Sequence, residues 1–238
     1  MAKSIQDKLF WLNIIKDFDS VVDYGCADGS LLKMLHNSIP DVLKIGYDID
    51  SNMIDAAQKN FPEAIFTTRM LKIAPTDHTV LNCSSVIHEV YSYAKSSDCI
   101  EDFWSIVFCS NYKYISIRDL CISKEIPYWT NRENLLKVMQ KSDRTQIEDF
   151  VKFHGSLNLT KNYIHYLLKY RYKNNWQREV RENYLPITLE ELLEKIPNTY
   201  KIKYLNHYTL PFTQEQIYKD FGVSLGHNTH VKLLLEHV

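Results

Sequence analysis

The sequence predicts an α/β fold, in which a mostly parallel sheet is covered by helices on both faces. Three observations support this prediction. Short apolar segments alternate with helical patterns through the first 120 of the 238 residues. A turn containing glycine, "DYGCADG" (23–29), follows the first apolar segment and opens a helix. The same alternation resumes after residue 187, and such alternation is typical of parallel sheets.

The elements of the first half follow from apolar spacing and from helix-ending residues. Ile5, Leu9, Leu12 and Ile15 share one helical face. Pro40 and Pro62 stand just beyond two later helical patterns. In chain order we expect a helix over 4–18, a strand over 20–24, a helix over 30–37, a strand over 42–48, a helix over 51–61, strands over 64–68 and 79–85, a helix over 97–109 and a strand over 112–118.

The pattern changes after Asp119. Residues 124–186 show several helical stretches and no convincing strand. A helix over 188–196 and strands over 200–208 and 230–238 follow. We therefore expect three parts: 1–122 as the first part of the sheet domain, 123–186 as a helical insertion, and 187–238 as the last part of the sheet domain.

The composition describes an ordinary globular chain. Apolar residues make up 45%, charged residues 24%, and the net charge is −1, so no global field attracts nucleic acid or an anionic membrane. No apolar run reaches the roughly 18 residues that span a bilayer, and the first residues do not resemble a secretory signal. Five scattered cysteines without a CxxC pair favour reduced thiols. We expect a cytoplasmic protein without a metal site.

The glycine turn and two carboxylates indicate a nucleoside site. Gly25 and Gly29 permit a tight turn beside the N-terminus of a helix. Asp23 precedes this turn, which is unfavourable for a pyrophosphate but suits a ligand that carries an ammonium group. Asp48 ends the second strand, where a carboxylate can bind the hydroxyls of a ribose. Together they indicate an adenosine derivative with a positively charged tail, and S-adenosylmethionine fits.

The segments "VVDYGCADGSLLKML" and "IGYDIDSNMIDAA" resemble the first two motifs of the class I S-adenosylmethionine-dependent methyltransferases. The resemblance covers about 20–120 and 188–238 and implies a doubly wound, Rossmann-like, seven-stranded sheet whose last strand is antiparallel. It also implies the residues that contact the cofactor. These are Asp23, Gly25, Ala27 and Gly29 at the methionine part, Asp48 at the ribose, Ile49 and Met53 at the adenine, with Tyr24 and Ser84 in the same site.

Other interpretations of these residues remain open. Gly25 and Gly29 can form a simple strand-to-helix turn, and Asp48 can cap a helix. A nicotinamide dehydrogenase is disfavoured because the spacing D-x-G-x-A-x-G departs from G-x-G-x-x-G and because Asp23 would repel a diphosphate.

The residues after the fourth and fifth strands are the candidates for catalysis. His88 titrates near neutral pH, and Glu89 can orient it, so we expect His88 as a general base. "IHEV" resembles the placement of the histidine base in plant O-methyltransferases. The alternative is a histidine that lines the pocket or caps the strand. Arg118 either binds an acidic acceptor group or forms a structural pair with Asp119.

The insertion has two interpretations. Residues 161–185 contain six basic and six aromatic side chains, a combination that can bind nucleic acid. Leu159, Tyr163 and Tyr166 instead recur at helical spacing, which indicates a packed face with Lys161, His165 and Lys169 on the solvent side. An amine-methylating DNA enzyme is disfavoured because "NCSSV" lacks that family's proline motif.

The sequence therefore predicts a methyltransferase that acts on a small or enclosed acceptor. A nucleic-acid methyltransferase and a non-catalytic module that binds the cofactor are the alternatives.

Overall fold

A computed structural model describes residues 7–70, 73 and 76–238. Seven strands form one sheet in the order β3-β2-β1-β4-β5-β7-β6. β7 is antiparallel to β5 and β6, and the other neighbours are parallel. The predicted sheet and its antiparallel last strand are confirmed. The strands are β1 Ser20–Tyr24, β2 Leu43–Tyr47, β3 Ile65–Thr67, β4 Thr79–Ser84, β5 Tyr114–Leu120, β6 Tyr200–Tyr208 and β7 His230–His237.

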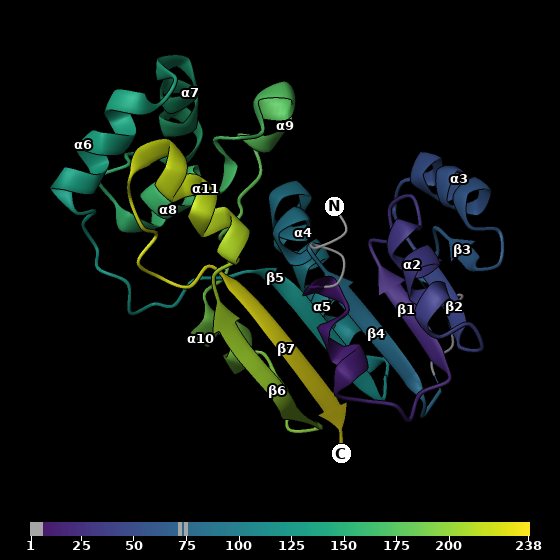
Figure 1. Cartoon of the computed structure of the whole chain (residues 1–238). Helices are drawn as coiled ribbons and strands as arrows, with labels where there is room; N and C mark the ends of the chain where they lie inside the picture. Colours follow the sequence, from purple (N-terminus) through teal and green to yellow (C-terminus); the bar gives the residue numbers. More distant parts are fainter. Residues whose placement is uncertain (1–6, 71–72, 74–75) are drawn as a thin grey trace.

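Helices cover both faces of this sheet, as predicted (Figure 1). One face packs against α4, α5 and α10 through a core that includes Phe103, Val107 and Leu192. The other face packs against the N-terminal segment and α2 through Trp11 and Leu32. The α-helices are α2 Ser30–Ser38, α3 Ser51–Asn60, α4 Ile87–Tyr93, α5 Ser97–Cys109, α6 Arg132–Lys141, α7 Arg144–His154, α8 Thr160–Lys169, α9 Trp176–Glu179, α10 Leu189–Glu194 and α11 Pro211–Phe221.

The N-terminal segment differs from the helix expected over 4–18. Residues 4–6 lie outside the described residues, Asp7 and Lys8 are helical, and a 3₁₀ turn, η1, follows at Phe10–Asn13, so the helix does not continue to residue 18. Leu9, Trp11 and Ile15 are all buried. Residues two apart lie on opposite sides of a regular helix, so Leu9 and Trp11 reach the same core only because the helix is interrupted.

The segment between β5 and α10 forms a second apolar core. It contains α6, α7, α8, a 3₁₀ turn, η3 (Lys173–Asn175), and α9. Side chains of α7 and α8, such as Phe150 and Ile164, pack together with Ile217 and Phe221 of α11. α11 connects β6 to β7 and was not expected from the sequence. Figure 1 shows α11 among the helices of the insertion, so this core joins two separate parts of the chain.

No helix within residues 7–70, 73 and 76–238 is both long and apolar enough to cross a membrane.

Candidate cofactor pocket and catalytic pair

The turn between β1 and α2 holds three residues in the left-handed backbone region. Gly25, Ala27 and Gly29 have φ angles of +75°, +45° and +73°. The N–H of Gly25 donates to the carbonyl of Tyr47 at 2.8 Å, which ties the turn to the end of β2. A Cβ atom on Gly25 would lie 2.8 Å from Cγ2 of Val86. Glycine therefore allows the turn to approach the loop after β4.

Asp48 lies between this turn and the start of α3. Its Oδ2 accepts a hydrogen bond from the N–H of Ala27 at 2.9 Å, and its Oδ1 accepts one from the N–H of Asp50 at 2.9 Å. These bonds fix the orientation of the carboxylate and leave further lone pairs on both oxygens. Ile49 is 85% exposed and Met53 is 40% exposed, so both side chains are accessible to a ligand at this edge.

Asp23 is buried on the other side of β1. Neighbouring residues of a strand point to opposite faces, and Asp23 points away from the face that holds Tyr24. Its Oδ1 accepts from Nδ2 of Asn82 at 2.8 Å, and Oδ1 of Asn82 accepts from Nε1 of Trp11 at 3.1 Å. Burial raises the pKa of Asp23 to about 6. The buried hydroxyl of Ser84 has no hydrogen-bond partner among the described residues, which leaves it available to a ligand.

A cavity of about 430 Å³ lies at the carboxyl edge of the sheet. Of the predicted cofactor residues it brings together Tyr24, Gly25, Asp48 and Ile49. The predicted catalytic residue Glu89 also lines it. Residues that were not foreseen complete the wall: Tyr47, Val86, Val90, Tyr93, Ala94, Lys95, Cys99 and Phe103. The other predicted cofactor residues do not line it: Asp23, Ala27, Gly29, Met53 and Ser84.

His88 and Asp119 form a buried pair next to this cavity. Nδ1 of His88 lies 2.6 Å from Oδ1 of Asp119. Asp119 also accepts from the N–H groups of Ile87 and Leu120, each at 2.7 Å. Burial alone would lower the pKa of His88, but the Asp119 carboxylate outweighs burial and the net pKa is raised. Since Asp119 engages Nδ1, the ring presents Nε2 as the nitrogen that can accept a proton.

The hydrogen-bond partner of His88 is Asp119 and not Glu89, although the nearby Glu89 carboxylate helps to raise the pKa of His88. Oε1 of Glu89 faces Nη2 of Arg178 at 3.6 Å. The same guanidinium donates through Nε to Oε1 of Glu182 at 3.0 Å. Single ligand atoms of His88, Glu89 and Glu182 lie within 4.8 Å of one another, as in a metal site. Arg178 pairs with both carboxylates and offsets part of their negative charge.

Arg118 is not at the rim of the sheet and does not pair with Asp119. β5 continues to Leu120, beyond the predicted end at 118, so both side chains belong to the strand and point to opposite faces. Nε of Arg118 donates to Oδ2 of Asp7 at 2.9 Å, and Nη1 donates to Oγ of Ser85 at 3.2 Å. The buried guanidinium therefore holds the N-terminal segment against the sheet.

The insertion buries most of its aromatic side chains. Of the six aromatics within 161–185, only Tyr172 is largely exposed, at 48%. Tyr163, Tyr166 and Tyr170 occupy the packed face of α8, as the spacing predicted. The solvent-facing assignment was wrong for His165 and Lys169, which are buried, and Lys161 is exposed. The buried pair faces residues 179–184, a segment that was not assigned a structure from the sequence.

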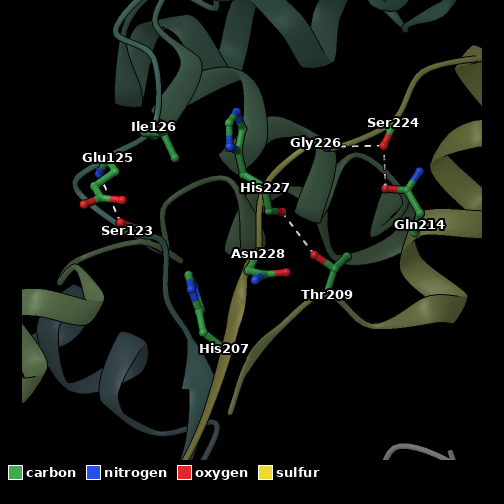
Figure 2. A pocket seen from close by; sticks show the side chains of 10 residues that line it. All are labelled: Ser123, Glu125, Ile126, His207, Thr209, Gln214, Ser224, Gly226, His227 and Asn228. Atoms are coloured by element: carbon green, nitrogen blue, oxygen red, sulfur yellow. Dashed lines mark hydrogen bonds between the residues drawn. The ribbon is translucent and has the colours of Figure 1, made fainter. Parts of the chain in front are cut away.

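A second cavity of about 450 Å³ lies where the start of the insertion meets the ends of β6 and β7 (Figure 2). Nε2 of His207 contacts the carbonyl of Cys121 at 3.1 Å, and Oγ1 of Thr209 donates to the carbonyl of His227 at 3.0 Å. Its lining is polar and shares no residue with the first cavity: Ser123, Glu125, Ile126, His207, Thr209, Gln214, Ser224, Gly226, His227 and Asn228.

Comparisons with known proteins place the chain at the level of fold. No protein-family model matches it, and no curated protein matches it in sequence. Among solved structures, it is similar to the plantazolicin methyltransferase BamL in complex with a triazolic desmethylPZN analog and SAH, with a TM-score of 0.53 and 10% identity over 99% of this chain and 84% of that chain.

Two further structures show the same similarity. The methyltransferase domain of bacterial CtHen1-C has a TM-score of 0.52 and 10% identity over 98% of this chain and 95% of that chain. The pyocyanin biosynthetic protein PhzM has a TM-score of 0.55 and 11% identity over 100% of this chain and 56% of that chain. Together with the strand order and the antiparallel β7, these matches show that the chain has the Rossmann-like fold of the class I S-adenosylmethionine-dependent methyltransferases.

Proposed function

We propose that the chain is an S-adenosylmethionine-dependent methyltransferase that acts on a small or enclosed acceptor, with His88 as general base. The observation that carries the proposal is that Gly25, Asp48 and Ile49 line one cavity at the carboxyl edge of the sheet. Ligands of open α/β sheets bind at this edge. The volume of about 430 Å³ lies within the range of small-molecule sites.

The residues present fit an adenosine derivative. Asp48 is held by two backbone N–H groups in an orientation that leaves lone pairs for ribose hydroxyls. Ile49 and Val86 supply apolar walls for a flat ring. BamL was crystallised with SAH, which supports the same ligand class here.

The bound cofactor would supply a methyl group on a positively charged sulfur. Transfer of this methyl group requires an acceptor aligned with the sulfur and no nucleophile from the protein. The contribution of the chain is then to position the acceptor and to remove its proton. Nε2 of His88 takes the proton, and Asp119 stabilises the imidazolium through Nδ1. The proton then passes to solvent when the site opens.

A small or enclosed acceptor is favoured by the packing of the insertion. Residues 179–184 dock on α4, the helix that carries His88, since the N–H of Asn183 donates to Oγ of Ser92 at 2.7 Å. Base stacking requires exposed aromatic faces, and most aromatics of 161–185 are buried. By their names, BamL is a plantazolicin methyltransferase and PhzM is a pyocyanin biosynthetic protein.

The test of cofactor binding is calorimetric titration with S-adenosylmethionine and S-adenosylhomocysteine. Asp48→Ala should weaken binding at least tenfold, because hydrogen bonds to a charged group are worth about 1.5–3 kcal/mol each. Asp55→Asn is the matched control, since Asp55 is an exposed carboxylate on α3. No binding of either ligand, together with binding of a nicotinamide dinucleotide, would contradict the proposal.

The acceptor class is tested by transfer of labelled methyl groups to DNA, RNA, protein and a metabolite extract in parallel. Label in the metabolite fraction supports the proposal. If label appears only in nucleic acid and transfer is lost at high salt, the acceptor is a nucleic acid and not a small molecule. Cofactor binding without transfer to any fraction would favour a non-catalytic module.

A further inference from the structure

The segment Glu179–Tyr184, which we call the return segment, is fixed to the insertion by a buried lysine. Lys169 at the end of α8 is fully buried. Its Nζ donates to the carbonyl of Glu179 at 2.7 Å and to the carbonyl of Glu182 at 2.5 Å. It also lies 4.3 Å from the centre of the Tyr184 ring. One ammonium group thus satisfies two main-chain carbonyls of the same segment.

Two buried histidines hold the same segment. Nε2 of His165, on α8, accepts from the N–H of Tyr184 at 3.1 Å. Nε2 of His154, on α7, lies 2.6 Å from the carbonyl of Val180. Burial lowers the pKa of both histidines, and the charge of Lys169 lowers it further. The two histidines and Lys169 thus bind the same segment from one side.

The other side of the return segment contacts the candidate base. The ring of Tyr184 meets the ring of His88 edge to face, with 5.3 Å between ring centres. The carboxylate of Glu182 accepts from the hydroxyl of Tyr93 at 2.8 Å. The return segment therefore packs between the core of the insertion and the helix that carries His88.

We propose that Lys169 is a positioning residue that fixes the return segment, so that Tyr184 holds the His88 ring in the orientation set by Asp119. This proposal rests on the proposed role of His88 as general base. Asp119 restrains the ring only at Nδ1, and a ring held at one atom can still tilt about that bond. The edge-to-face contact with Tyr184 is a second restraint on the ring. The direction of Nε2 towards the acceptor thus depends on a lysine that touches neither cofactor nor acceptor.

The charged and titratable groups that face Lys169 are few, and each has a defined contact. Glu179 and Glu182 raise its pKa and burial lowers it, with a net pKa of about 7. His165, His154 and Tyr184 complete its surroundings. Met has nearly the length of Lys but neither its charge nor its hydrogen-bond donors. The substitution Lys169→Met therefore removes the contacts to the return segment with little change of volume.

The experiment compares Lys169→Met with Lys161→Met, which removes the same charge from an exposed position of the same helix. We expect Lys169→Met to lower kcat at least tenfold while Kd for S-adenosylhomocysteine changes less than twofold. Lys161→Met should leave both unchanged. Wild-type kcat in a folded Lys169→Met variant would overturn the proposal. If Lys169→Met does not fold, Tyr184→Leu must show the same loss of kcat, and a wild-type kcat there would equally overturn it.

A spectroscopic measurement separates this proposal from the proposed function. The imidazole nitrogens of His88 are followed by ¹H–¹⁵N NMR across pH, which requires no acceptor. Lys169→Met should shift the His88 titration by at least half a pH unit, and Lys161→Met should not. An unchanged titration overturns the positioning role. Normal turnover in His88→Ala would instead refute the base, whatever the NMR result for Lys169.

Discussion

Replacing Asp119 by Asn tests the catalytic pair most directly. Asn keeps the size of the side chain but removes the charge that faces His88 at 2.6 Å. Burial then dominates and should lower the pKa of His88 below its ordinary value of 6.5. The amide group of Asn can also donate to an unprotonated Nδ1, which leaves the proton on Nε2 and prevents Nε2 from acting as the base. We expect kcat to fall by about 10²–10⁴, the usual contribution of a general base.

The same substitution has a predicted dependence of stability on pH. His88 has a raised pKa in the folded state, so its stabilisation is fully present below pH 6.5 and is lost as the pH rises through the folded pKa. Asp119 has a lowered pKa, so its stabilisation is present above pH 3.8 and is lost as the pH falls through the folded pKa. The pair therefore stabilises the fold most between these two values.

Chemical denaturation at several pH values measures this effect. Asp119→Asn should lower the free energy of unfolding by about 1–3 kcal/mol at pH 6, the cost of a disrupted buried hydrogen-bonding group. The loss should become smaller as the pH rises through the folded pKa of His88, where the ring loses its charge. Asp102→Asn, an exposed substitution on α5, serves as control. A loss that is independent of pH, with an unshifted pH profile of kcat/KM, would refute the reasoning.

Two further predictions concern the glycine turn and the buried acid before it. Gly25→Ala should lower the free energy of unfolding by at least about 1–2 kcal/mol, because φ is +75° and the new Cβ meets Val86. Adding Val86→Ala should restore only that part of the lost free energy of unfolding that comes from the contact between the new Cβ and Val86. Denaturation of the double variant measures this, and complete restoration would exclude backbone strain as a cause. Asp23 has a pKa raised to about 6, so wild-type stability falls as the pH rises from about 4 to about 6. Asp23→Asn should abolish this decrease in the urea midpoint, and an equal decrease in the variant would argue against the buried carboxyl group as its source.

The sheet was predictable from the sequence because each strand is short, apolar and followed by a turn or helix signal. The bounds of β1, α5 and β6 agree with the predicted ranges. The helix expected over 4–18 ends early, since Asp7 and Lys8 are helical but residues 15–18 are not, and Trp11 hydrogen-bonds Asn82, 71 residues away. Local spacing contains no information on that contact.

The cofactor side of the site was largely predictable, and the catalytic side was not. Gly25 and Asp48 come directly after the ends of β1 and β2, so the predicted strands place both at the carboxyl edge of the sheet. The partner of His88 was misassigned to Glu89 because the end of β5 was placed two residues too early. A strand that ends at Leu120 would have placed Asp119 beside the β4 end, since β4 and β5 are parallel neighbours. The burial of Lys169 could not be predicted from the sequence, because a lysine on a helix normally faces solvent.

The apolar core shared by the insertion and α11 limits how this protein can be recombined. A chimaera that exchanges 123–186 alone would leave Ile217 and Phe221 against a foreign surface. Exchanging the insertion for that of another protein of this fold therefore requires two crossover segments, the insertion and α11 together.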